Sequence, residues 1–356
     1  MSLKAFYKGK RVLVTGHTGF KGSWLVQWLD KMDSEICAIS LEPAEDNHFE
    51  RLNLDIESHY LNINDAQKID EVISAFKPEI VFHLAAQALV QYSYKNPVET
   101  YQTNVIGTMN VYEACRRVGS VKSIVSITTD KCYENMEWEW GYRENDRLGG
   151  HDPYSSSKAC TEIMTSSYIR SFFNLDNYGK DHNTLITTVR AGNVIGGGDW
   201  AENRIIPDIV RATVKNEAVE IRNPSAVRPW QHVLEPLLGY LKLGALLYEG
   251  KKEFATSWNF GPSADSTLTV LELTEIFQKY WEDVRFNLHK SNEFRHEANL
   301  LMLDCSKARK FLKWGEMLGA EKTIEWTVEW YKEFYKNGKI ITHHQIDEFM
   351  SQYGIS

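Results

Sequence analysis

The sequence predicts an α/β fold in which a doubly wound parallel sheet is joined to a smaller C-terminal α/β region built from separate segments. In the first half of the 356-residue chain, short apolar stretches alternate with amphipathic helical ones, which is typical of a parallel sheet covered on both faces. After residue 192 the pattern becomes irregular, with consecutive glycines and short strand-like pieces. We expect residues 1–192 to form one domain and 193–356 a second, with segments near 230–260 returning to the first.

The elements can be predicted in chain order from apolar stretches and helix boundaries. Strands are expected at RVLVTG, EICAISL, YLNI, EIVFHLA, SIVSITT and TLITTVRAG. Helices are expected from about Phe20, from Asp65, through TNVIGTMNVYEACRRV, and from Asp152-Pro153, because proline is tolerated in a first helical turn. In the irregular second half, the strand-like pieces are AVEIR and SWNFGP.

The composition excludes several classes of protein. Hydrophobic residues make up 43% and charged residues 25%, close to the average of globular chains. A net charge of −8 opposes broad attraction to nucleic acid or anionic lipid. The five cysteines lack a CxxC spacing, which favours reduced thiols over disulfides or zinc. Since we find neither a signal-type segment nor an apolar run of membrane-spanning length, we expect a cytoplasmic protein without nucleic-acid, membrane or metal partners.

A glycine-rich stretch, TGHTGFKG, follows the first strand and opens the first helix. Its glycines Gly16, Gly19 and Gly22 are three residues apart. They permit a tight turn, let backbone N–H groups approach a pyrophosphate, and allow the helix to pack closely on the sheet. This context predicts a Rossmann-type dinucleotide site. Glu42, at the end of the second strand, either bonds a ribose 2′-hydroxyl, which favours NAD over NADP, or is a solvated loop acid.

Two groups of residues carry possible proton chemistry. In YSSSK, Tyr154 and Lys158 are four residues apart and share one helix face. An adjacent ammonium stabilises the phenolate of a tyrosine, whose unperturbed pKa is near ~10, and the pair could accept a proton from a substrate hydroxyl beside a nicotinamide. The strand SIVSITT runs into Thr129, Asp130 and Lys131. That end is either a solvated turn or a proton-handling group.

These motifs resemble the extended short-chain dehydrogenases/reductases that act on nucleotide sugars. The resemblance covers nearly the whole chain and rests on TGHTGFKG, HLAAQ, TNVIGT, TTDKCY, YSSSK and RAGNVIGGGDW. Within that class, GHTGFKGSWL, ITTDK, RNPSAVRPWQHVLEPL and HEANLLMLDCSKA are most similar to CDP-glucose 4,6-dehydratases. The resemblance implies NAD as cofactor, a CDP-hexose as substrate, and a homo-oligomer that is a dimer or a tetramer.

The resemblance also implies a reaction, the conversion of CDP-D-glucose to CDP-4-keto-6-deoxy-D-glucose on a deoxysugar pathway of the O-antigen type. C4 is oxidised, water leaves across C5 and C6, and the hydride returns to C6. Tyr154 would take the C4 hydroxyl proton, Thr129 would hydrogen-bond the C4 oxygen, and Asp130 would protonate the departing C6 hydroxyl. Related dehydratases carry Glu beside the Asp, whereas this chain has Lys131. Lys131 is expected either to act as the C5 base, if its pKa is lowered, or to stabilise the enolate as a cation.

The remaining binding residues are implied by the same resemblance. The cofactor positions are Gly16, Thr18, Gly19, Phe20, Lys21, Gly22, Glu42, Asn62, Ile63, Ala85, Ala86, Gln87, Asn104, Tyr154 and Lys158. Asn62 stands where many relatives place Asp against the adenine, and its amide still offers a donor and an acceptor. The substrate positions are Asn193, Arg204, Arg228, His232, Asn259 and His296. Arg228 is expected at the pyrophosphate, because its planar fork suits that group.

Two other functions stay open. An NAD-dependent nucleotide-sugar 4-epimerase would share Tyr154 and Lys158 but would need no acid to expel a C6 hydroxyl, so Asp130 favours the dehydratase. A non-catalytic NAD-binding redox regulator could have the same fold, since fold alone does not establish activity. Such a regulator would need none of these three side chains.

Overall fold

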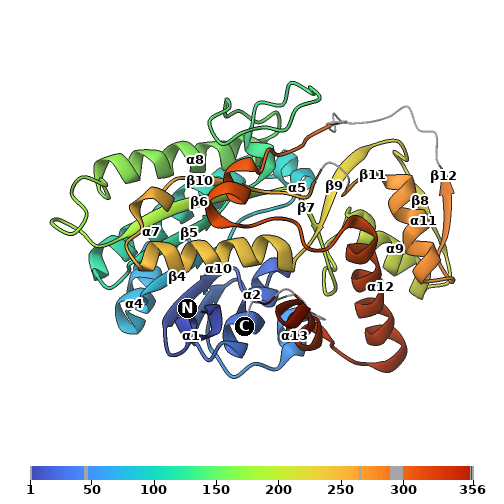
Figure 1. Ribbon diagram of the computed structural model, residues 1–356, viewed down its shortest axis with the longest axis horizontal. Coiled ribbons are helices and arrows are strands. Elements are labelled where there is room, and N and C mark those ends of the chain that lie inside the picture. The colour runs from blue at the N-terminus through green and yellow to red at the C-terminus, as the bar shows by residue number, and fades with distance from the viewer. Residues whose placement is uncertain (1, 44–46, 264–265, 289–299, 353, 355–356) are drawn as a thin grey trace.

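The computed structural model describes residues 2–43, 47–263, 266–288, 300–352 and 354, and its core is a seven-stranded sheet (Figure 1). The strand order is β10-β6-β5-β4-β1-β2-β3, and all neighbours are parallel. The chain starts at β1, adds β2 and β3 on one side, and then crosses to β4 on the other. The predicted Rossmann-type doubly wound sheet is therefore confirmed. Its strands are β1 Arg11–Thr15, β2 Glu35–Ser40, β3 Glu57–Tyr60, β4 Ile80–His83, β5 Ser123–Ile127, β6 Leu185–Ala191 and β10 Ser257–Phe260.

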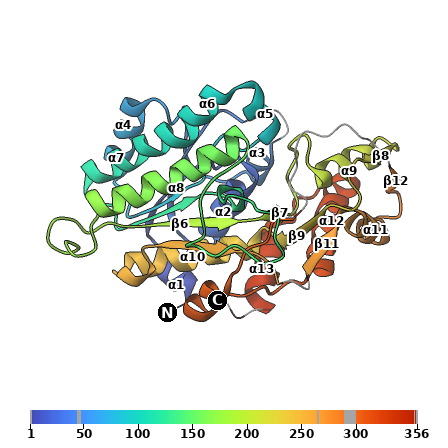
Figure 2. The same cartoon turned by 90° about the horizontal axis from the view of Figure 1, so that it is seen from above.

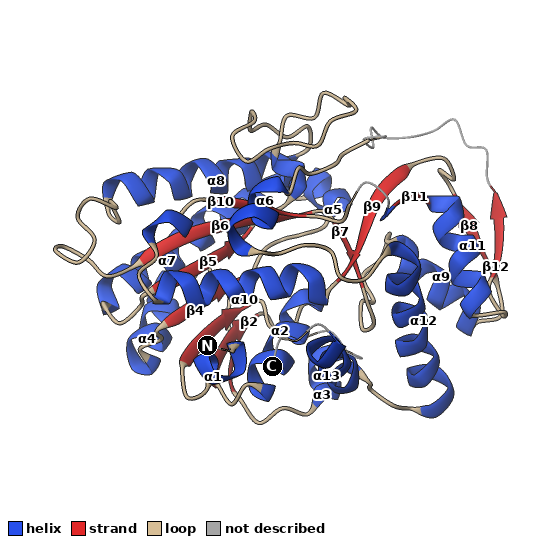
Figure 3. Cartoon of the chain, in the orientation of Figure 1, coloured by secondary structure: helices blue, strands red, loops and turns tan. Residues whose placement is uncertain are grey.

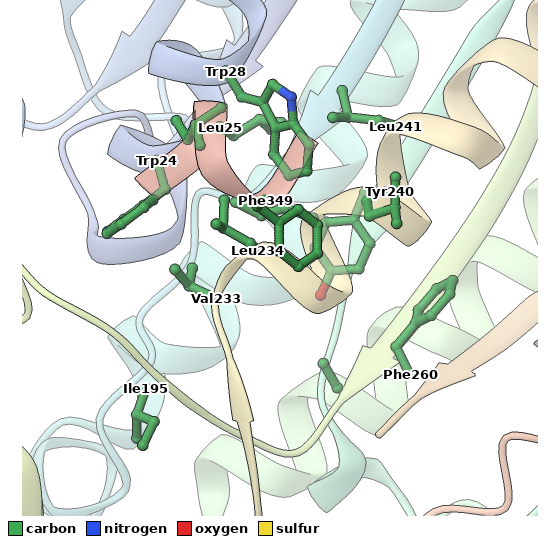
Figure 4. Close-up of a cluster of buried hydrophobic side chains, with 14 of the residues drawn as sticks. Trp24, Leu25, Trp28, Ile195, Val233, Leu234, Tyr240, Leu241, Phe260 and Phe349 are labelled. Atoms are coloured by element: carbon green, nitrogen blue, oxygen red, sulfur yellow. The ribbon is translucent and has the colours of Figure 1, made fainter. Parts of the chain in front are cut away.

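Helices cover both faces of this sheet (Figure 2). Because side chains alternate along a strand, Val12 and Val14 of β1 pack with α2 and α10, whereas Leu13 packs with α4 and α7 on the other face. Figure 4 shows the first of these cores, where Trp28 of α2 lies next to Leu241 of α10. The helices are α1 Leu3–Tyr7, α2 Phe20–Lys31, α3 His48–Leu52, α4 Ala66–Phe76, α5 Val90–Lys95, α6 Pro97–Tyr101, α7 Thr108–Val118, α8 Pro153–Ser171 and α10 Leu234–Tyr248. Within the described residues, no helix is both long and apolar enough to cross a bilayer.

The second half of the chain adds two small sheets and further helices (Figure 3). One sheet has the order β11-β9-β7 and the other pairs β12 with β8. Their strands are β7 Asn193–Ile195, β8 Ala218–Ile221, β9 Val227–His232, β11 Thr267–Thr269 and β12 Arg285–Leu288, with helices α9 Ile205–Val214, α11 Val270–Tyr280, α12 Ala320–Asn337 and α13 Thr342–Gln352. Between these segments the chain returns to the large sheet as α10 and β10, and α13 packs against α2. The division at residues 192 and 193 stays a prediction.

Two local predictions differ from the structure. The stretch YLNI is not a strand, because β3 is Glu57–Tyr60 and Asn62 then turns the chain by accepting a hydrogen bond from Asn64 N at 2.9 Å. The helix through TNVIGT starts as a π-helix, η1, over Gln102–Gly107. There the Asn104 carbonyl oxygen accepts the hydroxyls of Thr108 at 2.7 Å and Thr161 at 2.8 Å. The hydroxyl of Thr161 thus ties η1 to α8.

Candidate active site

The glycine-rich turn between β1 and α2 is too tight for side chains at two of its positions. Gly16 has a φ of +81°, and a Cβ there would lie 2.7 Å from Ala85 N. A Cβ on Gly22 would lie 2.0 Å from Gly16 O. Gly19 is the N-cap of α2 and offers no side chain to the first N–H groups of the helix. Since these groups and the helix dipole attract anions where the winding of the sheet reverses, the turn fits the pyrophosphate of a dinucleotide.

The loops after β2 and β3 bring other predicted cofactor residues to the same edge of the sheet. Glu42 follows β2 and is exposed, close to Thr18, whose hydroxyl contacts Ser40 Oγ at 2.6 Å. Asn62 follows β3 and is also exposed, whereas Ile63 is buried. Glu42 and Asn62 therefore lie where a ribose and an adenine of a dinucleotide on the turn could meet them.

Asn104 holds the loop after β4 in place. Its Oδ1 accepts Gln87 N at 2.8 Å, and its Nδ2 donates to Gln87 O at 3.0 Å and to Ser157 Oγ at 2.8 Å. Ala85 N donates to Thr15 Oγ1 at 3.2 Å. The predicted cofactor residues Ala85, Ala86 and Gln87 are thus fixed between the glycine-rich turn and α8. Asn104 acts through their backbone, because its own amide is fully used.

Thr129, Asp130 and Tyr154 meet beyond the carboxyl end of β5. The Thr129 hydroxyl donates to Asp130 Oδ1 at 3.1 Å, and Thr129 and Asp130 both act on the pKa of Tyr154. None of the three residues is more than 8% exposed. Asp152 caps α8 by accepting Ser155 N at 3.0 Å, so Tyr154 stands in the first turn of that helix. The predicted catalytic strand end and the predicted tyrosine are therefore neighbours.

Burial shifts the pKa values of Asp130 and Tyr154. It raises the pKa of Asp130 despite the opposing effects of Lys131, Thr129 and Lys21. A raised pKa favours the protonated form of Asp130, which is the form that a general acid needs. Burial also raises the pKa of Tyr154 to about 12, and the neighbouring Thr129 side chain opposes the rise.

The role of Lys158 beside Tyr154 stays a prediction. Lys158 lies one turn beyond Tyr154, and its Nζ donates to the Ile127 carbonyl oxygen at 3.1 Å. Arg204 is a cation near Tyr154, and it lowers the pKa of the phenol. Burial lowers the pKa of Lys158 to about 8, and it lowers that of Lys21 to about 8 with a further contribution from Arg204. Lys21, beside Phe20 in the glycine-rich turn, therefore belongs to the charge cluster around Asp130.

A small hollow adjoins Asp130. A Cβ on Gly192 would lie 3.2 Å from Asp130 Oδ2. The hollow has a volume of about 30 Å³, room for a water-sized group, and is lined by Gly192, Pro229, Gly261, Pro262, Ser263, Thr267, Met302 and Leu303. Lys131, the next residue along the chain, is exposed.

Three of the predicted substrate residues are half-buried. Asn193 starts β7, Arg228 lies on β9, and Arg204 is the N-cap of α9. The Arg204 guanidinium pairs with Asp199 at 2.9 Å and acts on Tyr154, which places it at the site. His296 lies outside the described residues.

Two other predicted substrate residues, His232 and Asn259, are fully buried, and their contacts with a substrate stay predictions. His232 packs edge-on between the rings of Trp24 and Trp326, each at 5.6 Å between centroids. Asn259 Oδ1 accepts the Tyr133 hydroxyl at 2.8 Å, and its Nδ2 donates to two backbone carbonyl oxygens at 2.8 and 3.3 Å. Both residues support the protein core. The Asn259 amide is fully hydrogen-bonded, whereas Nε2 of His232 has no partner among the described residues.

A buried ion pair next to the site was not predicted from the sequence. Arg190 of β6 pairs with Glu162 of α8 at 2.7 Å, and both side chains are only 2% exposed. The signal was present, because Glu162 follows Lys158 by four residues and so shares its helix face.

One group among the described residues could hold a metal ion. The ligand atoms of Cys37, Glu57 and His59 lie within 4.8 Å of one another. They belong to β2 and β3, away from β5, and His59 already hydrogen-bonds Glu57 at 2.7 Å. A reaction without a metal stays a prediction.

Known proteins resemble this chain in sequence and in structure. The sequence matches the GDP-mannose 4,6 dehydratase family over residues 13–327. A CDP-glucose 4,6-dehydratase of Salmonella typhimurium is 50% identical over 324 residues, which is 90% of each chain. An epimerase of Methanothermobacter thermautotrophicus superposes with a TM-score of 0.81 at 23% identity, covering 94% of this chain and 95% of its own. The NAD complex of UDP-glucose 4-epimerase from Thermus thermophilus gives 0.77 at 22% identity, covering 90% and 99%. The two solved structures show a shared fold, and the family match shows that the chain belongs to the GDP-mannose 4,6 dehydratase family.

Proposed function

We propose that this protein is an NAD-dependent hydro-lyase that dehydrates a nucleotide sugar across C5 and C6, and that its substrate is CDP-D-glucose. The observation that carries the proposal is the buried Asp130, whose pKa burial raises, beside Tyr154 at the edge of the sheet. The relative from Salmonella typhimurium, 50% identical, supports the choice of sugar nucleotide. A product of this kind, a 4-keto-6-deoxy sugar, would enter deoxysugar synthesis of the O-antigen type.

Each side chain of the site has a task in this reaction. The glycine-rich turn would hold NAD⁺, which would accept the hydride from C4 and, once reduced, return it to C6. Tyr154 takes the C4 hydroxyl proton while Thr129 holds the C4 oxygen, and Arg204 favours the phenolate. Asp130 gives its proton to the C6 hydroxyl as that group leaves. Because Lys131 is exposed to solvent, we assign it the role of a cation that stabilises the enolate, while another group takes the C5 proton and returns it.

The 4-epimerase alternative is less well supported. The solved epimerase structures, at 22–23% identity, share the fold alone. An epimerase does not expel a C6 hydroxyl and so has no use for a protonated carboxyl there. A redox regulator would need neither Asp130 nor Tyr154.

Incubation with a panel of sugar nucleotides tests the proposal. The purified protein would receive NAD⁺ and CDP-, dTDP-, GDP- or UDP-glucose, with GDP-mannose as a further member. We expect the alkali absorbance of a 4-keto-6-deoxy product with CDP-glucose and little with the other nucleotides. Conversion to the C4 epimer, with the C6 oxygen retained, would instead establish the epimerase.

We also propose a cytoplasmic homo-oligomer, a dimer or a tetramer. Apolar side chains are exposed on α6, η1 and α8, which pack side by side, at Val98, Ile106 and Ile163. Exposed apolar groups on neighbouring helices favour self-association. Light scattering at several protein concentrations measures the oligomeric state.

A further inference from the structure

Glu162 connects the helix of Tyr154 to two strands of the sheet. It lies on α8, one turn beyond Lys158. Its carboxylate accepts hydrogen bonds from Thr128 Oγ1 at 2.5 Å and Thr188 Oγ1 at 2.7 Å, and from two nitrogens of Arg190 at 3.0 and 2.7 Å. Thr128 directly follows β5, and the other two donors lie on β6. A single side chain thus holds α8 against both strands.

Glu162 is a buried anion. Burial alone would raise its pKa, but the Arg190 guanidinium and the hydroxyls of Thr128 and Thr188 keep the pKa below its usual value. Arg190 also donates to the Tyr133 hydroxyl at 2.6 Å, which fixes the guanidinium in place. The carboxylate therefore stays charged at neutral pH.

Lys158 depends on this anion. Burial lowers the pKa of Lys158 to about 8, and Glu162 is the main group that acts in the opposite direction. A lysine with a pKa near 8 is mostly charged at neutral pH, but a further fall in its pKa would leave much of it neutral. Losing the Glu162 anion would cause such a fall in the pKa of Lys158.

Through Thr128, Glu162 also reaches the residues that follow β5. The next residue, Thr129, donates its hydroxyl to Asp130 Oδ1 at 3.1 Å and lies close enough to Tyr154 to lower its pKa. A change in where Glu162 holds Thr128 would therefore shift Thr129 relative to Asp130 and Tyr154.

We propose that Glu162 is a positioning residue that keeps Lys158 in its charged form and aligns the strand end of Thr129 and Asp130 with the helix of Tyr154. The proposal rests on the function proposed above, because it assumes that the charged lysine and the aligned tyrosine are used in catalysis. Arg190 is its structural partner, which keeps the buried carboxylate from being an unpaired charge.

The test measures the titration of Lys158 directly. Lysine labelled with ¹³C at Cε is incorporated into the full-length protein, and the Lys158 signal is assigned by its loss in Lys158→Met. We compare the wild type with Glu162→Gln and with the double variant Glu162→Leu/Arg190→Met. The double variant is included because an unpaired Arg190 could unfold the single variant, whereas a buried ion pair replaced by apolar side chains is often tolerated. Thr188→Val is the matched control, since it removes one hydrogen bond to the same carboxylate without a change in charge.

We expect the Lys158 pKa to fall by roughly one unit in the Glu162 variants, which is a tenfold change in the ratio of charged to neutral lysine. Thr188→Val should leave that titration near the wild type. A folded double variant in which Lys158 titrates as in the wild type would overturn the proposal.

A second measurement separates this proposal from the proposed function. The NMR titration needs no substrate, so it stands even if no sugar nucleotide is converted, an outcome that would refute the proposed function alone. With an active substrate, the rate of NADH formation is followed against pH. We expect the alkaline fall in that rate to begin roughly one unit lower in the Glu162 variants than in Thr188→Val. An alkaline limb at the same pH in both would contradict the role of Glu162, because a purely structural loss lowers the rate at every pH.

Discussion

Asp130, which follows β5, and Asn259, which lies on β10, are both buried near the carboxyl ends of strands of the large sheet, but their polar atoms have different partners. The carboxylate of Asp130 is hydrogen-bonded to its neighbour Thr129 and adjoins the hollow at Gly192. The amide of Asn259 is used completely, with the hydroxyl of Tyr133 and two carbonyl oxygens as partners. Burial therefore does not distinguish the proposed catalytic carboxyl of Asp130 from the structural amide of Asn259. The difference is that the Asp130 carboxylate keeps unused hydrogen-bonding capacity near the hollow at Gly192, whereas the Asn259 amide has none.

The largest expected effect is the loss of turnover when the hydroxyl oxygen of Tyr154 is removed. Tyr154→Phe keeps the ring and so should keep the fold and NAD binding, while turnover falls by ~10²–10⁴-fold because the proton acceptor is gone. Circular dichroism and an NAD titration would establish the fold and the binding, and product absorbance the turnover. Near-normal turnover in a folded variant would remove Tyr154 from the mechanism.

Asp130→Asn should separate oxidation from elimination. The amide keeps the shape of the carboxyl but cannot donate an acidic proton, so overall turnover should fall by roughly 10²–10⁴-fold. Enzyme-bound NADH and a 4-keto hexose that retains its C6 oxygen should accumulate, as seen by single-turnover absorbance and by mass spectrometry after a rapid quench. If Asp130 only stabilises the turn, the variant should lose about 0.5–2 kcal/mol of stability and release the normal product.

Glu235 is an intermediate case, a buried carboxyl with only one oxygen in use. Its Oε1 accepts Met317 N at 2.9 Å and Leu318 N at 2.6 Å, while Oε2 has no partner among the described residues. Burial raises its pKa from 4.5 to about 7. Between these pH values the folded state keeps a proton that the unfolded state loses, so the free energy of unfolding should fall by about 3 kcal/mol as pH rises from 4.5 to 7.

Urea unfolding at several pH values checks this expectation. Glu235→Gln keeps an acceptor for the two N–H groups but cannot ionise, so its stability should vary less with pH over that range. The same slope in the variant and the wild type would show that other groups cause it.

Asn259→Ala should lower stability by about 2–3 kcal/mol, because a buried hydroxyl and two carbonyl oxygens lose their partner. Asn287→Ala is the matched control, since Asn287 is exposed and its side chain donates to Glu220 Oε1 at 2.8 Å on the surface. The control should change the free energy of unfolding by no more than about 0.5 kcal/mol. Equal losses of unfolding free energy in the two variants would show that a buried, fully hydrogen-bonded amide stabilises the fold no more than an exposed one.

The smallest effect is expected for His232→Phe. Phenylalanine keeps the ring contacts with Trp24 and Trp326, and Nε2 of His232 has no hydrogen-bond partner among the described residues. Stability should change by less than about 1.5 kcal/mol and the KM for the sugar nucleotide should stay the same. Arg228→Met, by contrast, should raise that KM by roughly 10–100-fold if the guanidinium holds the pyrophosphate. A raised KM in His232→Phe would restore His232 to the substrate site.

The part of the site that could be predicted from sequence is the part whose position follows from the regular geometry of the parallel sheet. Gly16 follows β1, Asp130 follows β5, and a parallel sheet brings the carboxyl ends of its strands to one edge. The positions of His232 and Asn259 could not be predicted, because no periodicity in the second half of the chain shows which side chains face a ligand. The contact of Lys158 with Ile127 depends on the path of a long side chain, which spacing on a helix does not determine.

The position of β10 also bears on how the chain folds during synthesis. β6 is flanked by β10 on its outer side, yet the chain between them forms β7, α9, β8, β9 and α10. Until residue 257 has left the ribosome, β6 is an unpaired edge whose residues are all buried in the finished protein. Such an edge can pair with another nascent chain. Slow translation through the segment between these strands should therefore lengthen the period in which aggregation competes with folding.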